Sequence, residues 1–283
     1  MSDHLIEADA LRQVLSDPDW LVFDVRYNLS DAKAGEQAYL SGHIPGARFL
    51  DQGTQLASQS TGRNGRHPLP DPDKLRRLLQ QQGLTSQSQV VVYDHNDGSF
   101  AARAWWLLRW LGCSQVRILN AGLQSWLDAG GELQASTSLP PLHDVPAADS
   151  VRAAMPTVGV ADIESDAQDK QLLLIDARTA ERYRGETEPI DPVAGRINGA
   201  LNRPIANNLQ PDGRFKPSAQ LHDEFQALLG QRPAEQVVHY CGSGITACHN
   251  VFAMELAGLG GSALYPGSWS EWCSDADRPV ATG

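Results

Sequence analysis

The residues best suited to chemistry in this sequence form one short stretch, in which Cys241 precedes a loop of glycines and hydroxyl residues. A largely apolar run typical of a β-strand, 237–240, ends at the cysteine, and residues 247–259 carry apolar side chains at helical spacing. The thiol therefore lies where a strand is followed by a helix N-terminus. Gly242 and Gly244 let the backbone turn tightly, so that N–H groups and the positive end of the helix can face one point. Such a setting binds an anion and favours a nucleophilic thiolate.

An alternative is that Cys241 is a small buried hydrophobic residue, as a lone cysteine at a strand end commonly is. The loop argues against this, because its glycines, serine and threonine are poor core material. We therefore interpret Cys241 as a nucleophile. Its anion-binding loop would consist of Gly242, Ser243, Gly244, Ile245, Thr246 and Ala247. Cys248, on an early turn of the helix, could be a resolving thiol or a ligand but is more typical of packing.

The sequence around this loop resembles the rhodanese superfamily, and within it the mercaptopyruvate and thiosulfate sulfurtransferases. The motifs that carry the resemblance extend over nearly the whole chain. They are Cys-Gly-Ser-Gly-Ile-Thr-Ala at 241–247, Asp-Ala-Arg at 176–178, Glu-Arg-Tyr-Arg-Gly at 181–185, Tyr-Pro-Gly-Ser-Trp-Ser-Glu-Trp at 265–272 and Ser-Gly-His-Ile-Pro-Gly-Ala at 41–47.

The resemblance implies sulfur transfer by double displacement. The Cys241 thiolate would take sulfur from a small anionic donor, 3-mercaptopyruvate or thiosulfate, and hold it as a persulfide. The acceptor would be cyanide, a small thiol or a dithiol protein. Neither a metal nor an organic cofactor is implied.

The resemblance also assigns roles to residues outside the loop. Arg182 would bind the donor's carboxylate, and His67 would help with proton transfer. A second substrate arginine of many mercaptopyruvate enzymes is missing, because Ile190 follows the Glu-Pro pair at 188–189. Arg196 could replace it, and Trp269 could line the mouth of the pocket.

The donor is left open by two opposing features. Neutral Gly242 and Ser243 follow the cysteine, where enzymes that favour thiosulfate typically have basic residues, so the loop favours mercaptopyruvate. Ser243 could also hydrogen-bond its keto oxygen. The missing arginine at Ile190 argues the other way.

The chain contains an internal repeat. Residues 21–26 resemble 173–178, 42–47 resemble 195–200, 90–94 resemble 237–241, and 119–126 resemble 265–272. In each half, short apolar runs alternate with helical segments such as 72–82 and 101–111, which is typical of a mostly parallel sheet with helices on both faces.

We therefore predict an α/β protein of two tandem rhodanese-like domains, residues 1–134 and 151–283, joined by a proline-rich linker at 135–150. Asp94 stands in the first half where Cys241 stands in the second, so the N-terminal domain cannot perform the same chemistry. The polar run at 61–68, which contains His67, is either a wall of the active site or a solvated loop.

Composition excludes several classes of protein. A formal net charge of −11 at pH 7 disfavours a nucleic-acid partner, and no stretch is long and apolar enough to span a membrane. Four cysteines in 283 residues are too few for a disulfide framework, so we expect reduced thiols and a cytoplasmic location. A cysteine-dependent phosphatase or arsenate reductase would need an arginine where Ala247 stands. A non-catalytic sulfur-carrier or signalling module would be favoured by aspartate in both loops, whereas this chain keeps one cysteine.

Overall fold

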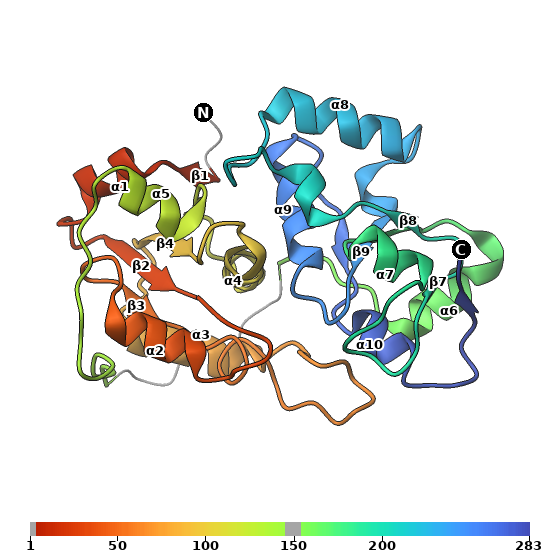
Figure 1. Ribbon diagram of the computed structural model, residues 1–283, viewed down its shortest axis with the longest axis horizontal. Helices are drawn as coiled ribbons and strands as arrows, with labels where there is room; N and C mark the ends of the chain where they lie inside the picture. Colours follow the sequence, from red (N-terminus) through yellow and green to blue (C-terminus); the bar gives the residue numbers. More distant parts are fainter. Residues whose placement is uncertain (1–3, 145–153) are drawn as a thin grey trace. The chain divides into compact units, whose positions relative to one another are not determined.

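The computed structural model describes residues 4–144 and 154–283, and these divide into two compact units (Figure 1). The N-terminal unit holds the described residues of Met1–Ser58, Pro70–Ala154 and Pro211–Arg214. The C-terminal unit holds those of Gln59–Leu69, Met155–Gln210 and Phe215–Gly283. The segment Gln59–Leu69, which contains His67, thus belongs to the C-terminal unit. The predicted domain boundaries stay predictions, because the cut between the halves falls outside the described residues.

The N-terminal unit is built on one parallel sheet. Its described strands are hydrogen-bonded in the order β1-β5-β4-β2-β3, all parallel. The elements follow the chain as β1 (Leu5–Ile6), α1 (Ala8–Val14), β2 (Trp20–Asp24), α2 (Ala34–Ser41), β3 (Arg48–Phe49), α3 (Pro72–Gln81), β4 (Gln89–Tyr93), α4 (Ser99–Trp110), β5 (Val116–Leu119) and α5 (Gly122–Asp128).

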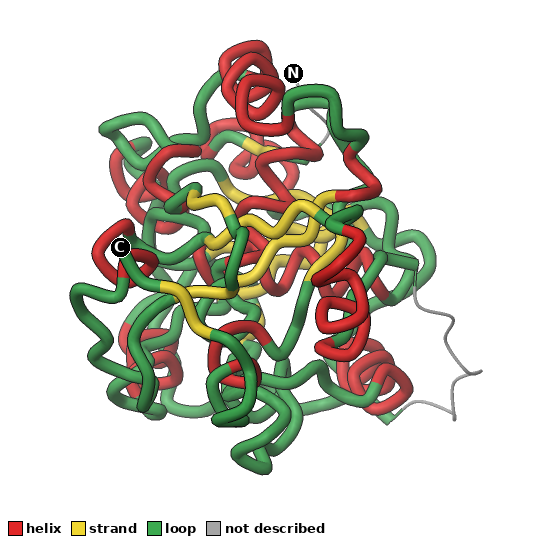
Figure 2. The backbone as a smooth tube through the Cα atoms, turned by 90° about the vertical axis from the view of Figure 1, so that its right-hand side faces the viewer, coloured by secondary structure: helices red, strands yellow, loops and turns green. Residues whose placement is uncertain are grey.

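The C-terminal unit repeats this plan with a shorter sheet, β10-β9-β6-β8, again parallel. β11, the strand that precedes the C-terminus marked in Figure 2, pairs antiparallel with β7. The elements are α6 (Val160–Asp169), β6 (Leu173–Asp176), α7 (Ala180–Arg184), β7 (Arg196–Ile197), β8 (Leu201–Asn202), η1 (Ile205–Asn208), α8 (Ser218–Leu229), η2 (Ala234–Gln236), β9 (Val237–Tyr240), α9 (Ala247–Leu256), β10 (Ala263–Leu264), α10 (Ser268–Trp272) and β11 (Val280–Ala281).

The two sheets share their central register, which confirms the predicted fold class and the repeat. Asp24 pairs with Tyr93 at the ends of β2 and β4, and Asp176 pairs with Tyr240 at the ends of β6 and β9. Since the carboxyl ends of parallel strands meet at one edge, the loops after β4 and β9 occupy equivalent positions in the two units.

Helices cover both faces of each sheet because the buried strand residues alternate between the faces. In the N-terminal unit one face packs against α1 and α5 through Leu11 and Trp126, while α2 and α3 lie on the opposite side in Figure 1. In the C-terminal unit one face packs against α6 and α10, and His239 of the other face contacts Met254 of α9 (Nε2–Sδ 3.1 Å).

The predicted helices begin and end within a few residues of the observed ones. The helix predicted at 72–82 is α3, which begins at a proline and is capped by the Asp71 carboxylate, an acceptor from Asp73 N and Lys74 N. Trp105, Trp106 and Trp110 of α4 are buried in the core. Of the helices in the described part of the chain, none has the length and apolar character needed to cross a membrane.

Candidate active site

Cys241 directly follows β9 and is held from two sides by backbone contacts. Its N–H donates to Ser268 Oγ (3.1 Å), and its carbonyl accepts from Trp269 N (2.9 Å). The Gly244 N–H donates to Cys241 Sγ (3.2 Å). The thiol therefore lies under the loop that leads into α9, with a backbone donor directed at its sulfur, and the residue is 1% exposed.

Ser268 is a site residue that sequence analysis missed. It is fully buried, its Oγ donates to Tyr265 O (2.9 Å), and its φ of +54° lies in the left-handed region that costs a non-glycine residue free energy. The repeat has Gly122 at the equivalent position, with a φ of +56°. A serine where the other half has glycine is the signal that could have found it. The serine side chain has a use at this position, because its hydroxyl accepts a hydrogen bond from the Cys241 N–H.

The two loop glycines serve different purposes. Gly244 has a φ of +79°, and a Cβ there would lie 2.3 Å from Pro266 O, so this position requires glycine. A Cβ on Gly242 would instead lie 2.9 Å from Arg66 Nη2 and 3.5 Å from Arg182 Nη2. Gly242 therefore leaves room for two guanidinium groups beside the residue that follows the cysteine.

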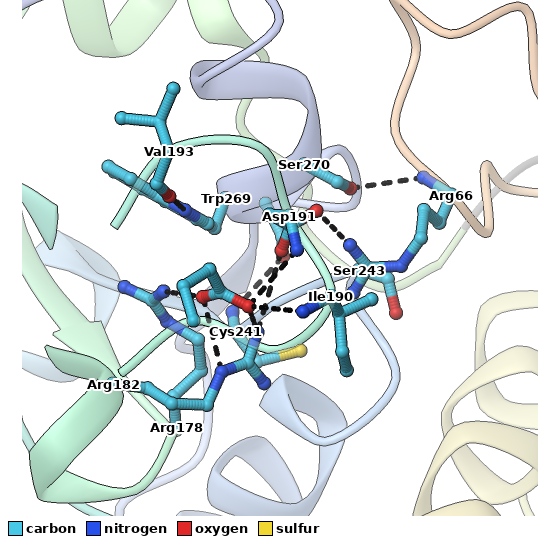
Figure 3. A network of polar contacts seen from close by, with 12 residues as sticks. Arg66, Arg178, Arg182, Ile190, Asp191, Val193, Cys241, Ser243, Trp269 and Ser270 are labelled. Atoms are coloured by element: carbon cyan, nitrogen blue, oxygen red, sulfur yellow. Dashed lines mark hydrogen bonds and ion pairs between the residues drawn. The ribbon is translucent and has the colours of Figure 1, made fainter. Parts of the chain in front are cut away.

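Two carboxylates, of Glu188 and Asp191, contact these two guanidinium groups (Figure 3). Arg182 donates to both oxygens of Glu188 (Nη2–Oε1 2.7 Å and Nε–Oε2 3.2 Å). Arg66 Nη1 donates to Asp191 Oδ1, and Arg182 Nη2 lies 3.5 Å from Asp191 Oδ2. The Arg182 side chain is 17% exposed and that of Arg66 is 28% exposed, so both reach solvent. Arg182 was predicted from the sequence to bind the donor's carboxylate. Arg66 was predicted only as part of the polar run at 61–68.

Arg178 is structural, as its equivalence to Arg26 predicts. It donates to the Asp176 carboxylate (Nη2–Oδ2 2.7 Å) and lies over the Trp269 ring (4.8 Å), while Arg26 pairs in the same way with Asp24 (2.6 Å). The Asp176 carboxylate and its hydrogen bond with Arg178 raise the pKa of that guanidinium despite its burial.

His67 and Ser243 are brought together. His67 Nδ1 lies 2.9 Å from Ser243 Oγ, and both residues are buried. The segment that carries His67 is anchored one residue earlier, where Arg66 N donates to Ser270 Oγ (3.0 Å). The chain thus offers a hydroxyl in hydrogen-bond contact with an imidazole, two residues after the cysteine.

Three other residues considered from the sequence lie outside this cluster. Arg196 donates from β7 to the carbonyls of Tyr183 and Gly283, away from the loop. Trp269 has no exposed surface and donates to Val193 O (2.9 Å), so it supports Arg178 rather than lining an opening. The Cys248 thiol is buried and donates to Gly244 O (3.4 Å), which fits packing.

Comparison with known proteins identifies the family. A family model of the rhodanese-like domain matches residues 7–129 and again 160–275, which together make up most of the chain. The chain belongs to the rhodanese-like family. Both matched ranges fall on the sequence repeat, so the rhodanese-like domain is present twice.

Relatives extend the similarity over the whole length. The chain is 48% identical to a probable 3-mercaptopyruvate sulfurtransferase of Pseudomonas aeruginosa, covering 100% of this chain and 99% of that one. It is 31% identical to the thiosulfate sulfurtransferase of Rattus norvegicus, covering 94% and 89%. Among solved structures, 3-mercaptopyruvate sulfurtransferase from Leishmania major superposes with a TM-score of 0.82 at 28% identity, covering 99% of this chain and 76% of that one.

Proposed function

We propose that this rhodanese-like protein is a sulfurtransferase that carries sulfane sulfur as a persulfide on Cys241, with 3-mercaptopyruvate as its preferred donor. The observation that carries the proposal is the arrangement at the loop after β9. A cysteine lies under a backbone N–H at the start of a helix, and two guanidinium groups flank the next residue. A nucleophile for sulfur and an anchor for a carboxylate are thereby adjacent.

The first half-reaction breaks the carbon–sulfur bond of the donor. The Cys241 thiolate attacks the donor sulfur, a sulfur–sulfur bond forms, and the carbon–sulfur electron pair goes to the carbon as the enolate of pyruvate. Arg182 holds the donor's carboxylate through this step. The remaining loop N–H groups from Gly242 to Ala247 and the Thr246 hydroxyl receive the outer sulfur.

A proton must then reach the enolate carbon. Ser243 is the group assigned to deliver it, because its hydroxyl is two residues from the cysteine and contacts His67 Nδ1 at 2.9 Å. His67 returns a proton to the serine, so that the pair relays the proton of the donor thiol to the methyl group of pyruvate. Thiosulfate needs no such step, since its sulfite leaving group departs without protonation at carbon.

The second half-reaction regenerates the thiolate. A nucleophilic acceptor attacks the outer sulfur, the sulfur–sulfur bond breaks, and its electron pair returns to Cys241. Cyanide leaves as thiocyanate, and a thiol leaves as its own persulfide. We propose a thiol acceptor in the cytoplasm, where thiols are kept reduced.

Thiosulfate is the second candidate donor, and one observation favours it. Arg66 and Arg182 together could bind a doubly charged anion beside Gly242. Two features favour mercaptopyruvate. Gly242 and Ser243 are neutral, which suits a donor with a single carboxylate. The Ser243–His67 pair can protonate the enolate of pyruvate, a step that thiosulfate does not need.

The test measures both donors side by side, first with cyanide and then with a dithiol as acceptor. We expect kcat/KM for mercaptopyruvate to exceed that for thiosulfate by at least about tenfold, a difference of ~1.4 kcal/mol in transition-state binding. Intact-protein mass spectrometry after donor treatment should find one added sulfur. Equal efficiencies, or a preference for thiosulfate, would make thiosulfate the donor, and turnover without persulfide would overturn the mechanism.

A further inference from the structure

The charges beside the cysteine loop are balanced before any donor binds. Two guanidinium groups, of Arg66 and Arg182, face Gly242, and two carboxylates, of Glu188 and Asp191, contact them. Arg178 also contacts Glu188 (Nη1–Oε2 3.1 Å), but its charge is offset by buried Asp176 (Nη2–Oδ2 2.7 Å), so the count is unchanged. A donor that brings its own negative charge must therefore compete with a carboxylate of the protein.

The two carboxylates are held very differently. Glu188 accepts from Arg178, from Arg182 and from the backbone N–H groups of Ile190 and Asp191, both 3.1 Å away. Hydrogen bonds and nearby positive charge, outweighing burial, lower the pKa of Glu188. This carboxylate is a fixed part of the fold, and it orients Arg182.

Asp191, by contrast, is bound through its carboxylate to the two guanidinium groups that reach solvent. Its partners are Arg66 Nη1 and, at 3.5 Å, Arg182 Nη2. Burial, with a smaller contribution from the charge of Glu188, raises the pKa of Asp191 even though arginines surround it. Its negative charge is therefore the less stabilised of the two.

We propose that Asp191 is an internal counterion that occupies the arginine pair Arg66–Arg182 until the donor's carboxylate replaces it. Arg66 reaches this pair from the segment Gln59–Leu69. This inference rests on the proposed function for the identity of the donor, but the exchange of one carboxylate for another does not require turnover.

The exchange makes the site selective for charge. A monocarboxylate that replaces Asp191 leaves the number of charges on the arginine pair unchanged. A doubly charged donor adds one negative charge in excess, beside the fixed Glu188. Asp191 thus disfavours thiosulfate relative to mercaptopyruvate, and it also weakens the binding of any carboxylate by competing with it.

The first arm of the test is direct binding of pyruvate to the full-length protein, measured by calorimetry. Arg66→Leu should weaken binding about tenfold or more, whereas Arg63→Leu, which changes an exposed arginine of the same segment, should leave it unchanged. Asp191→Asn should tighten binding several-fold. Glu186→Gln is the matched control for that variant, because it neutralises an exposed carboxylate of the neighbouring segment that pairs with Arg184.

The second arm measures kinetics with both donors. Arg66→Leu should raise KM more than it lowers kcat, and Arg66→Lys should recover part of the loss. Asp191→Asn should raise kcat/KM for thiosulfate about tenfold more than for mercaptopyruvate. Thermal unfolding of each variant separates a loss of fold from a loss of binding.

The outcomes separate the two proposals. If the wild type forms no persulfide with either donor, while pyruvate binding follows Arg66 and Asp191 as described, the proposed function fails and the counterion role stands. If sulfur transfer proceeds but neither substitution changes pyruvate binding, Asp191 is a structural partner only and the inference is overturned. Equal gains for both donors in Asp191→Asn would overturn the charge selectivity.

Discussion

The loops after β4 and β9 occupy equivalent positions in the two units, yet one carries an anion of the chain and the other a thiol. The Asp94 carboxylate accepts from Gly98 N (3.1 Å) through one oxygen and from Phe100 N (2.9 Å) and Ala101 N (3.1 Å) through the other. Adding 147, the offset that relates 94 to 241, places these donors at 245, 247 and 248. The N-terminal loop is therefore an anion cradle that is permanently filled.

This difference shows what the cysteine loop is shaped to hold. A carboxylate oxygen lies one bond beyond Cγ of aspartate, just as the outer sulfur of a persulfide lies one bond beyond Sγ of cysteine. The filled loop thus indicates where that sulfur would be bound. Sulfur transfer also needs charged groups around the loop. The N-terminal unit has Ser30 at the position that corresponds to Arg182. In the described chain, the hydrogen bond found for the Ser30 hydroxyl is to Asn28 Oδ1 of its own turn (2.7 Å).

The largest effect is expected from replacing Cys241 with aspartate, the residue that the loop after β4 has at the equivalent position. Cys241→Asp and Cys241→Ser should each abolish sulfur transfer, by about a thousandfold or more, because neither oxygen can store sulfane sulfur. Asp94→Ala and Cys248→Ser should keep a substantial part of the activity. The measurement is turnover together with intact mass after donor treatment, and an added sulfur retained in Cys241→Ser would contradict the assignment.

The next effect tests the hydroxyl at position 243, for which the first loop has Asn96. Ser243→Ala should lower kcat with mercaptopyruvate by about a hundredfold, because the enolate loses its proton donor, and should affect thiosulfate far less. Asn96→Ala is the matched control and should change neither. Equal losses with both donors would mean that Ser243 holds the loop rather than relaying a proton.

A smaller effect is expected at Arg182, the arginine that the N-terminal unit lacks. Arg182→Leu removes a charge-assisted contact worth about 1.5 to 3 kcal/mol, so KM for the donor should rise roughly ten- to a hundredfold. Arg184→Leu, two residues away and paired with exposed Glu186, serves as the control. Normal donor affinity in Arg182→Leu would show that the carboxylate binds elsewhere.

The smallest effect on activity is expected at Asp94, where the readout is stability. Burial, together with the charge of Asp97, raises the pKa of Asp94 from 3.8 to about 6, although three backbone N–H groups favour its charged form. The folded protein then binds a proton that the unfolded chain releases between about pH 4 and 6. Stability relative to Asp94→Asn should fall as the pH rises through this range, by roughly 3 kcal/mol at most. Denaturant unfolding at pH 4.5 and 7.5 measures it, and a pH-independent difference would refute the shift.

Much of the fold could be predicted because it depends on local sequence patterns that occur in both halves of the chain. Apolar runs gave the strands, and the match of 90–94 to 237–241 predicted both sheets. The loop around Cys241 was predictable for the same reason, since closely spaced glycines favour a tight turn, and Gly244 has a φ of +79° there. The residues that contact that loop were harder to predict. Arg66 is 125 residues from Asp191 in sequence, and no local pattern distinguishes it from Arg63.

Ser268 shows a second limit of sequence reasoning. A left-handed serine contradicts backbone preference, so propensity argues against the conformation that the site requires. Gly122 has the same conformation in the repeat, so the turn sets the φ, and the contact of the Ser268 hydroxyl with the Cys241 N–H explains why a serine stands there. Ile190 shows a third limit. The sequence lacks an arginine at this position, but that says nothing about a guanidinium group from a distant segment, such as that of Arg66.

The loop after β9, which has Cys241 in place of a carboxylate, also links the stability of the protein to its supply of sulfur. Any anion that binds only the folded loop stabilises the fold, by about 2.7 kcal/mol when its concentration is a hundred times its Kd. The N-terminal loop carries its own anion and gains nothing from donor. The C-terminal unit, in contrast, should melt at a temperature that rises with persulfide loading, so that an idle enzyme unfolds and is degraded sooner than a working one.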